Sequence, residues 1–150
     1  MDETDLKIIE LLAVDSKRSL ADIGQGVGLS PSSVNERIRR LVASGTIRRF
    51  TVDLDPLALN RDTLVFVWLG LRESSDETAF RRYAQTHRSI LECHHVTGAW
   101  AYLLKIRVGS PSEIEGFLAE LKAEGFLGRS ETVLALSSPV SGAFLPKDGV

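Results

Sequence analysis

Apolar residues recur at two different spacings along this chain, and the change of spacing divides it into two parts. Up to about residue 50 they recur every three or four residues, the spacing of amphipathic helices. Beyond residue 62, strand-like runs alternate with two further helical stretches. The first part predicts three helices, with apolar stripes at Leu6, Ile9, Leu12 and Ala13, at Leu20, Ile23, Gly24 and Val27, and at Val34, Ile38, Leu41 and Val42.

The third of these helices has clear start and stop signals. Ser30 can accept a hydrogen bond from an otherwise unpaired backbone N–H, and Pro31 suits the first helical position, where no N–H is needed. Gly45 marks the end of the helix. The next stretch, TIRRFTVDL at 46–54, is rich in β-branched and aromatic residues and predicts a short strand, or wing.

The second part predicts four strands and two helices in the order βαββαβ. Ser110 and Glu113 predict a capping box at the start of the second helix. This order is typical of a ferredoxin-like domain, in which both helices cover one face of an antiparallel sheet. The strands are expected at 63–71, 90–96, 100–108 and 129–137, and the helices at 76–87 and 110–125.

The fold class predicted for the whole chain is therefore α+β. A winged helix-turn-helix domain is expected at 1–52 and a ferredoxin-like domain at 63–150. Between them, 53–62 contains Pro56 and Asn60, which break regular structure and indicate a linker.

The predicted sheet is apolar on both faces, although two helices can cover only one of them. In the first strand, Val65, Val67, Leu69 and Leu71 alternate with Leu64, Phe66 and Trp68, and in the third strand one face carries Trp100, Tyr102, Leu104, Ile106 and Val108. A large exposed apolar face is a liability, so a partner surface is expected to cover it. A homodimer is the simplest arrangement, and the alternative is that the N-terminal part folds over the sheet.

Composition narrows the class of protein. The chain has 150 residues, 43% apolar and 25% charged, with a net charge of −2, which is ordinary for a soluble globular protein. Its longest apolar run, 64–71, is far shorter than the roughly 20 residues that cross a bilayer. The N-terminus is acidic, unlike a signal peptide, and one cysteine excludes an internal disulfide. We expect a cytoplasmic, nucleoid-associated protein without a membrane partner.

The modest net charge conceals a basic segment. Residues 17–49 contain seven basic and two acidic side chains, a local charge of +5, so the rest of the chain carries −7. Such a segment on an acidic body suggests a local site for a polyanion.

The spacing of LADIGQGVGLSPSSVNERIRRL, at 20–41, is that of a helix-turn-helix. Gly24 allows the two helices to approach, Gly28 can adopt the positive φ of the turn, and Leu29 fills the core beneath it. Serine, asparagine and arginine can bond to base edges in the major groove, while Arg18, Arg48 and Arg49 could contact phosphates. The outward face of the last helix is predicted to carry Ser32, Ser33, Glu36, Arg39 and Arg40, flanked by Asn35 and Arg37. The alternative is a plain three-helix bundle whose arginines are only solvated.

Over residues 2–146 the chain resembles the Lrp/AsnC (feast/famine) transcription regulators. The segments that carry the resemblance are DETDLKIIELL, GLSPSSVNERIRRLVASGTIRRF, LDPLALN, ILECHHVTG, AYLLKIRV and SETVLALSS, in this order. The resemblance implies sequence-specific binding of double-stranded DNA through a winged helix-turn-helix, and a ferredoxin-like effector-binding domain. It also implies homodimers that pair through both domains and assemble into octamers.

The loop at 97–101 is the candidate effector site. Nearby Cys93, His94 and His95 cannot all face one metal ion from a strand, so we assign no metal, and nothing indicates a catalytic residue or a cofactor. In the resembled family the loop pattern is Gly-Asp-aromatic-Asp and binds an amino acid between dimers. The resemblance assigns the effector to Gly98, Ala99, Trp100, Ala101, Thr132 and Leu134.

Alanine at both acidic positions of this pattern leaves the identity of the effector open. A carboxylate is the natural partner of an ammonium group, so losing it should weaken amino-acid binding about 10- to 100-fold unless Glu131 or another group compensates. Three alternatives follow. The protein senses a less basic or more apolar ligand, it acts without a ligand as an architectural repressor, or it binds an ordinary amino acid through other groups.

Overall fold

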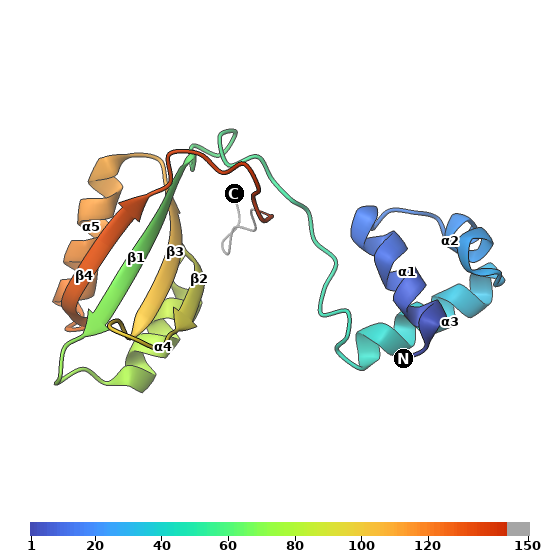
Figure 1. Cartoon of the computed structure of the whole chain (residues 1–150), viewed down its shortest axis with the longest axis horizontal. Helices are drawn as coiled ribbons and strands as arrows, with labels where there is room; N and C mark the ends of the chain where they lie inside the picture. The colour runs from blue at the N-terminus through green and yellow to red at the C-terminus, as the bar shows by residue number, and fades with distance from the viewer. Residues whose placement is uncertain (144–150) are drawn as a thin grey trace. The chain divides into compact units, whose positions relative to one another are not determined.

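The computed structural model describes residues 1–143 and divides the chain into two compact units (Figure 1). The first unit is Met1–Thr51 and the second begins at Val52. Each unit has its own hydrophobic core, which is the main reason to treat them as separate folding units.

The first unit consists of three helices, α1 (Glu3–Val14), α2 (Leu20–Val27) and α3 (Pro31–Ala43). Its core is formed by Ile8, Ile23, Val34 and Leu41, of which the first three are fully buried. The predicted stripe of α1 was wrong at Leu6, which is 48% exposed, and at Ala13, which is also exposed. At about 100° per residue, Leu6 and the central core residue Ile8 lie on opposite sides of the helix.

The turn between α2 and α3 has the predicted geometry. Gly28 ends α2 in the left-handed conformation, with φ of 70°. A Cβ on Gly24 would lie 2.4 Å from the carbonyl oxygen of Leu29, so only glycine fits where the turn passes over α2. The Ser30 hydroxyl accepts a hydrogen bond from the Ser33 N–H at 3.2 Å and begins α3, as predicted.

The predicted wing strand does not form in the single chain. Residues 46 and 47 form a bend, and no residue of 46–54 pairs as a strand with any part of residues 1–143. A strand requires a neighbour that satisfies its N–H and C=O groups, and local propensity alone does not provide one. Phe50 and Val52 in this segment remain 54% and 60% exposed.

The second unit has the predicted order of elements. The strands and helices are β1 (Thr63–Leu71), α4 (Glu77–Thr86), β2 (Ile90–His95), β3 (Tyr102–Val108), α5 (Pro111–Ala123) and β4 (Leu127–Leu134). The strands pair antiparallel in the order β2-β3-β1-β4, which confirms the ferredoxin-like fold. Trp100 lies before β3 rather than within it, because the loop from β2 extends to Ala101.

The capping box predicted for α5 is absent. Ser110 precedes the helix, but its hydroxyl pairs with Ser112 and makes no cap bond. The Glu113 carboxylate instead accepts from the Gly109 N–H at 3.2 Å and binds Arg61 at 2.5 Å. The end of the predicted linker is thereby attached to the second unit.

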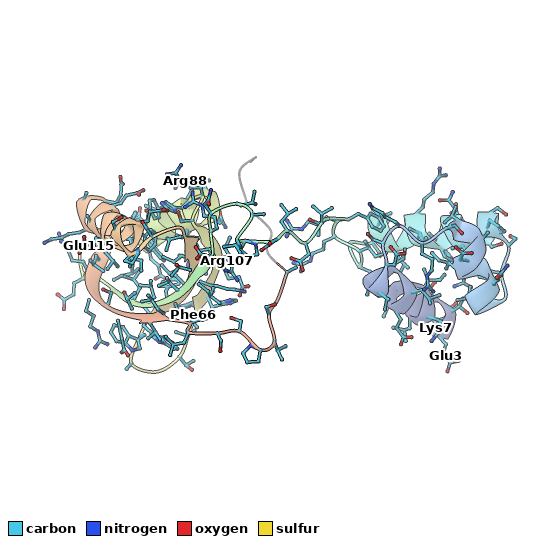
Figure 2. The ribbon with its side chains drawn as sticks, turned by 90° about the horizontal axis from the view of Figure 1, so that it is seen from above. Glu3, Lys7, Phe66, Arg88, Arg107 and Glu115 are labelled. Carbon is cyan, nitrogen blue, oxygen red and sulfur yellow. The ribbon has the colours of Figure 1, made fainter. Side chains whose placement is uncertain are left out.

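The residues of β1 divide between the two faces of the sheet as predicted, but the second face is less apolar than expected, because Lys105, Arg107 and Glu131 share it. Val65, Val67 and Leu69 are fully buried under α4 and α5 together with Leu104 and Ile106. Figure 2 shows Phe66 on the opposite side of the sheet from the helices. We call this second side the open face. By strand register it carries Leu64, Phe66 and Trp68 of β1, Leu103 of β3 and Val133 of β4.

Segment 135–143 borders one end of the open face. It encloses a cavity of about 270 Å³ with Leu64, Phe66 and Arg107. The far end, around Trp68, is not part of that cavity. Trp68 and Leu103 are each only half-buried, so this end of the face offers apolar surface to a partner.

Candidate DNA interface and effector site

Helix α3 presents a polar and basic surface on the side away from the core. A hollow of about 510 Å³ on this side is lined by Leu29, Ser32, Ser33, Glu36, Arg37 and Arg40. The core side of the same helix holds Val34 and Leu41. This separation follows from the helical period, and five of the ten predicted DNA-contacting residues line the hollow.

Arg37 is held by the first turn of α1. One of its guanidinium nitrogens donates to Asp2 at 2.8 Å and to Asp5 at 2.7 Å. These hydrogen bonds lower the pKa of both carboxyl groups and raise the pKa of the guanidinium. Asp2 and Asp5 also form the capping box of α1, so the three residues fix the start of α1 against the middle of α3. The sequence pattern did not reveal this contact.

The other predicted DNA-binding residues lie around this surface. Arg39 is exposed on α3, whereas Asn35 is half-buried at its flank. Arg48 and Arg49 are exposed on the extended segment after α3, and Arg18 is half-buried between α1 and α2. Val42, predicted on the buried side, is 45% exposed at the end of the helix. The exposed arginines have their donors available to phosphates or bases.

The loop between β2 and β3 crosses the end of the sheet where β1 finishes and β4 begins (Figure 1). Gly98 adopts φ of 102°, which favours glycine. The Ala101 N–H donates to the carbonyl oxygen of Leu69 in β1, and its carbonyl accepts from the Val96 N–H, each at 3.0 Å. Ala99 is exposed and Trp100 is half-buried.

Arg129 is a residue of this site that the sequence did not reveal. Its guanidinium carbon lies 4.4 Å from the centre of the Trp100 ring, and one guanidinium nitrogen donates to the Ala99 carbonyl oxygen. The residue is exposed at the start of β4. Thus the loop whose predicted pattern lacked acids is also in contact with a cation.

The two effector residues predicted on β4 lie farther from this loop. Thr132 and Leu134 stand opposite Val67 and Val65 in the sheet, on the face that carries the helices. Arg129 stands opposite Gly70, on the open face. Within one chain the structure therefore places Arg129, rather than Thr132 or Leu134, against the loop.

The histidines and cysteine near the loop divide between the two faces, as predicted. Cys93 and His95 line a cavity of about 350 Å³ beside α4, and the His95 ring stacks on Tyr102. His94 is on the other face, 3.1 Å from Glu92. Within residues 1–143 no three His, Cys, Asp or Glu side chains come together as metal ligands. Over the same residues no helix is both long and apolar enough to span a membrane.

A helix-turn-helix with a basic outer face, joined to a ferredoxin-like domain, defines a class of DNA-binding transcriptional regulators. Residues 1–42 match the AsnC-type helix-turn-helix domain, and residues 64–143 match the Lrp/AsnC ligand binding domain. The chain belongs to the Lrp/AsnC family of transcriptional regulators.

Several relatives support this membership. The HTH-type transcriptional regulator LrpC of Bacillus subtilis is 36% identical over 118 residues, covering 79% of this chain and 81% of LrpC. The leucine-responsive regulatory protein of Escherichia coli is 36% identical over 122 residues, covering 80% and 74%.

Solved structures agree over nearly the whole chain. LrpC superimposes with a TM-score of 0.82 at 32% identity, over 91% of this chain and 95% of its own. An AsnC family regulator from Agrobacterium tumefaciens has a TM-score of 0.88 at 28% identity, over 97% of each chain.

Proposed function

We propose that the chain is a sequence-specific regulator that reads the DNA major groove with α3. The observation that carries this proposal is the hollowed outer surface of α3, where serine hydroxyls and Arg40 lie together. Serine and arginine donate to base edges, and arginine can bind guanine through two hydrogen bonds. Arg39, Arg48 and Arg49 would contact phosphates on either side, while Arg37 would act as a positioning residue through Asp2 and Asp5.

Removing Arg39 and Arg40 together tests this surface. The wild-type protein first selects its preferred DNA from a random-sequence pool. We expect the double change Arg39→Ala and Arg40→Ala to weaken binding of that DNA about 10- to 100-fold in a gel-shift titration. The slope of log affinity against log salt should fall by about 1 to 2, because each lost phosphate contact removes nearly one released counterion.

A matched control separates a specific contact from a change of net charge. Arg82→Ala with Arg88→Ala removes the same charge from exposed positions on and after α4 (Figure 2 labels Arg88). This control should keep the affinity within about twofold, since charge outside the interface contributes little at physiological salt. Equal losses for both double variants, or none for either, would contradict the assignment of α3.

A homodimer is supported by apolar surface in both units. The first unit exposes Leu6, Val42 and Phe50, and the second exposes Val52 and the Trp68 end of its open face. In a dimer, segment 46–54 could pair with the same segment of a second copy and form the predicted wing. Two-fold symmetry would then present two α3 helices to a pseudo-palindromic site, and octamers of such dimers would add avidity.

A small metabolite bound at the 97–101 loop is proposed to modulate the regulator. The match of residues 64–143 to a ligand binding domain and the similarity to a leucine-responsive regulator support a small-molecule effector, and the contacts of Arg129 with Trp100 and Ala99 support this loop as its site. The effector would shift the assembly state only if it binds the alternative states unequally. A DNA-binding regulator of this kind would act at the nucleoid in the cytoplasm.

The alternative function is that of an architectural repressor that acts without a ligand. It is favoured by the alanines at 99 and 101, where the resembled family has acids. Sedimentation velocity with and without a panel of amino and 2-oxo acids separates the two. A change of assembly state with any of them would exclude the ligand-independent alternative.

A further inference from the structure

The backbone of the 97–101 loop offers hydrogen-bond donors that the protein does not use. Within residues 1–143, the N–H groups of Thr97, Gly98, Ala99 and Trp100 donate to no protein acceptor. The flanking residues do have partners, since Val96 donates to Ala101 and Ala101 donates to Leu69. Four consecutive amides are therefore available at the tip of the loop for an acceptor.

The side chain of Arg129 lies on the open face of the sheet and extends toward the 97–101 loop. The position that allows this is Gly70, opposite Arg129 in the register of β1 and β4. A Cβ on Gly70 would lie 2.9 Å from Cγ and 3.1 Å from Nε of Arg129, so any larger residue would displace the side chain. Because Gly70 has no side chain, the Arg129 side chain can lie against the backbone of β1 and reach Trp100.

The contacts of Arg129 leave part of its hydrogen-bonding capacity unused. One guanidinium nitrogen donates to the Ala99 carbonyl, and the plane lies over the Trp100 ring at 4.4 Å. A guanidinium has five N–H donors, and the residue is exposed, so an outer edge remains for an oxygen pair. Stacking on Trp100 also restricts the rotamers of the side chain, which reduces the entropy lost when a ligand binds.

The same site lacks a group that would receive an ammonium ion. Residues 96–101 contain no acidic side chain. The guanidinium itself repels a second cation. Glu131 is the nearest acid along β4. It stands opposite Trp68, two register pairs beyond the Arg129–Gly70 pair, on the same face of the sheet but away from the 97–101 loop. Charge and hydrogen-bond donors at the loop therefore favour an anion rich in acceptors.

We propose that this corner of the sheet, formed by Arg129, Gly70, Trp100 and the 97–100 amides, binds a small carboxylate without an ammonium group, with 2-oxo acids as the favoured class. The carboxylate pairs with the free edge of Arg129, and the neutral 2-oxo oxygen accepts from the loop amides. The inference rests on the proposed role of the loop as the effector site. The preferred ligand is then a 2-oxo acid in place of the amino acid that the family resemblance implies.

Matched ligand pairs test the preference. Pyruvate is compared with alanine, and 2-oxoglutarate with glutamate, by titration calorimetry on the full-length protein at concentrations up to the millimolar range. Each pair keeps its carbon skeleton and carboxylates and differs at the 2-position. We expect each 2-oxo acid to bind at least about 10-fold more tightly than its amino acid, since a charge-assisted contact to a carboxylate is retained while the cationic repulsion is removed.

Variants of the chain locate the site. Arg129→Gln and Gly70→Ala should each weaken binding of the 2-oxo acids about 10-fold or more, the first by removing the cation and the second by displacing it. Arg88→Gln, an exposed arginine before β2, is the matched control and should leave the affinity unchanged. Glu131→Gln should preserve the order of each ligand pair.

The outcomes separate this inference from the proposed function. Tighter binding of the amino acids, equal affinities within each pair, no binding of either class, or unchanged 2-oxo acid binding in Arg129→Gln would each overturn the anion site. Binding of the selected DNA is measured separately without ligand. Its loss would overturn the proposed regulator, whereas normal DNA binding with a failed ligand test would overturn only the inference about Arg129.

Discussion

At the scale of single residues, the contact of Arg37 with Asp2 and Asp5 is the most consequential in the first unit. Arg37 is 35 positions from Asp2 and 32 positions from Asp5 in the sequence. The contact holds the start of α1 against α3, the helix proposed to read DNA. The Arg37 hydrogen bonds hold the pKa of both carboxyl groups below their usual value of 3.8. A lowered pKa means that the stabilisation is present above that value and disappears as the pH falls through the folded-state pKa.

Asp5→Asn should therefore lower the melting temperature of the first unit at neutral pH and make its loss on acidification shallower. Circular dichroism melts between pH 7 and pH 3 measure both effects. Glu3 lies in the same first turn and forms no ion pair within residues 1–143, so Glu3→Gln controls for the helix dipole (Figure 2 labels Glu3). Identical pH profiles for the two variants would rule out a special role for the Arg37 contact.

At the scale of elements, the corner between α2 and α3 depends on two glycines for different reasons. Gly24 lacks space, because a Cβ would meet the Leu29 carbonyl oxygen at 2.4 Å. At Gly28 a Cβ would have space, but the φ of 70° lies in the left-handed region that favours glycine. The first requirement is set by packing between elements and the second by local backbone conformation, so the two substitutions should differ in cost.

Gly24→Ala should destabilise the first unit by about 1–3 kcal/mol or more, because rigid backbone must move. Gly28→Ala should cost about 1–2 kcal/mol, the penalty of the left-handed region for a residue with a Cβ. Gly116→Ala is the control, because Gly116 lies in α5 with open space around it. It should raise the free energy of unfolding of the second unit by about 1 kcal/mol. Urea unfolding followed by circular dichroism ranks the three, and a larger loss from Gly28→Ala than from Gly24→Ala would contradict the packing argument.

At the scale of the whole molecule, the open face of the sheet links fold to assembly. A charge placed on it should prevent a second copy from covering it. We expect Trp68→Glu to shift sedimentation velocity toward the monomer and to weaken DNA binding about 100-fold or more, because the avidity of paired domains is lost. Ala119→Glu adds the same charge on the exposed surface of α5 and should change neither measurement. A dimer that persists in Trp68→Glu would place the interface elsewhere.

Local features were predicted well because they depend on neighbours in the sequence. The helix-turn-helix follows from Ser30, Pro31 and the spacing of Gly24 and Gly28, and the βαββαβ order follows from the change in apolar period. The failures have equally physical causes. The wing at 46–54 needs a partner strand, and the Ser110 cap was replaced by the contacts of Glu113 with Gly109 and Arg61.

The sequence by itself determined the two folding units, the polar face of α3 and the loss of acids from the 97–101 loop, since periodicity and residue identity need no tertiary information. Only the tertiary structure decided what meets that loop. Antiparallel pairing returns β4 beside β1, and the bare Gly70 lets Arg129 reach a carbonyl 30 residues away. Contacts of that separation depend on strand register and side-chain direction, which no local pattern encodes. These contacts place the Arg129 cation against a loop that has no acidic side chain.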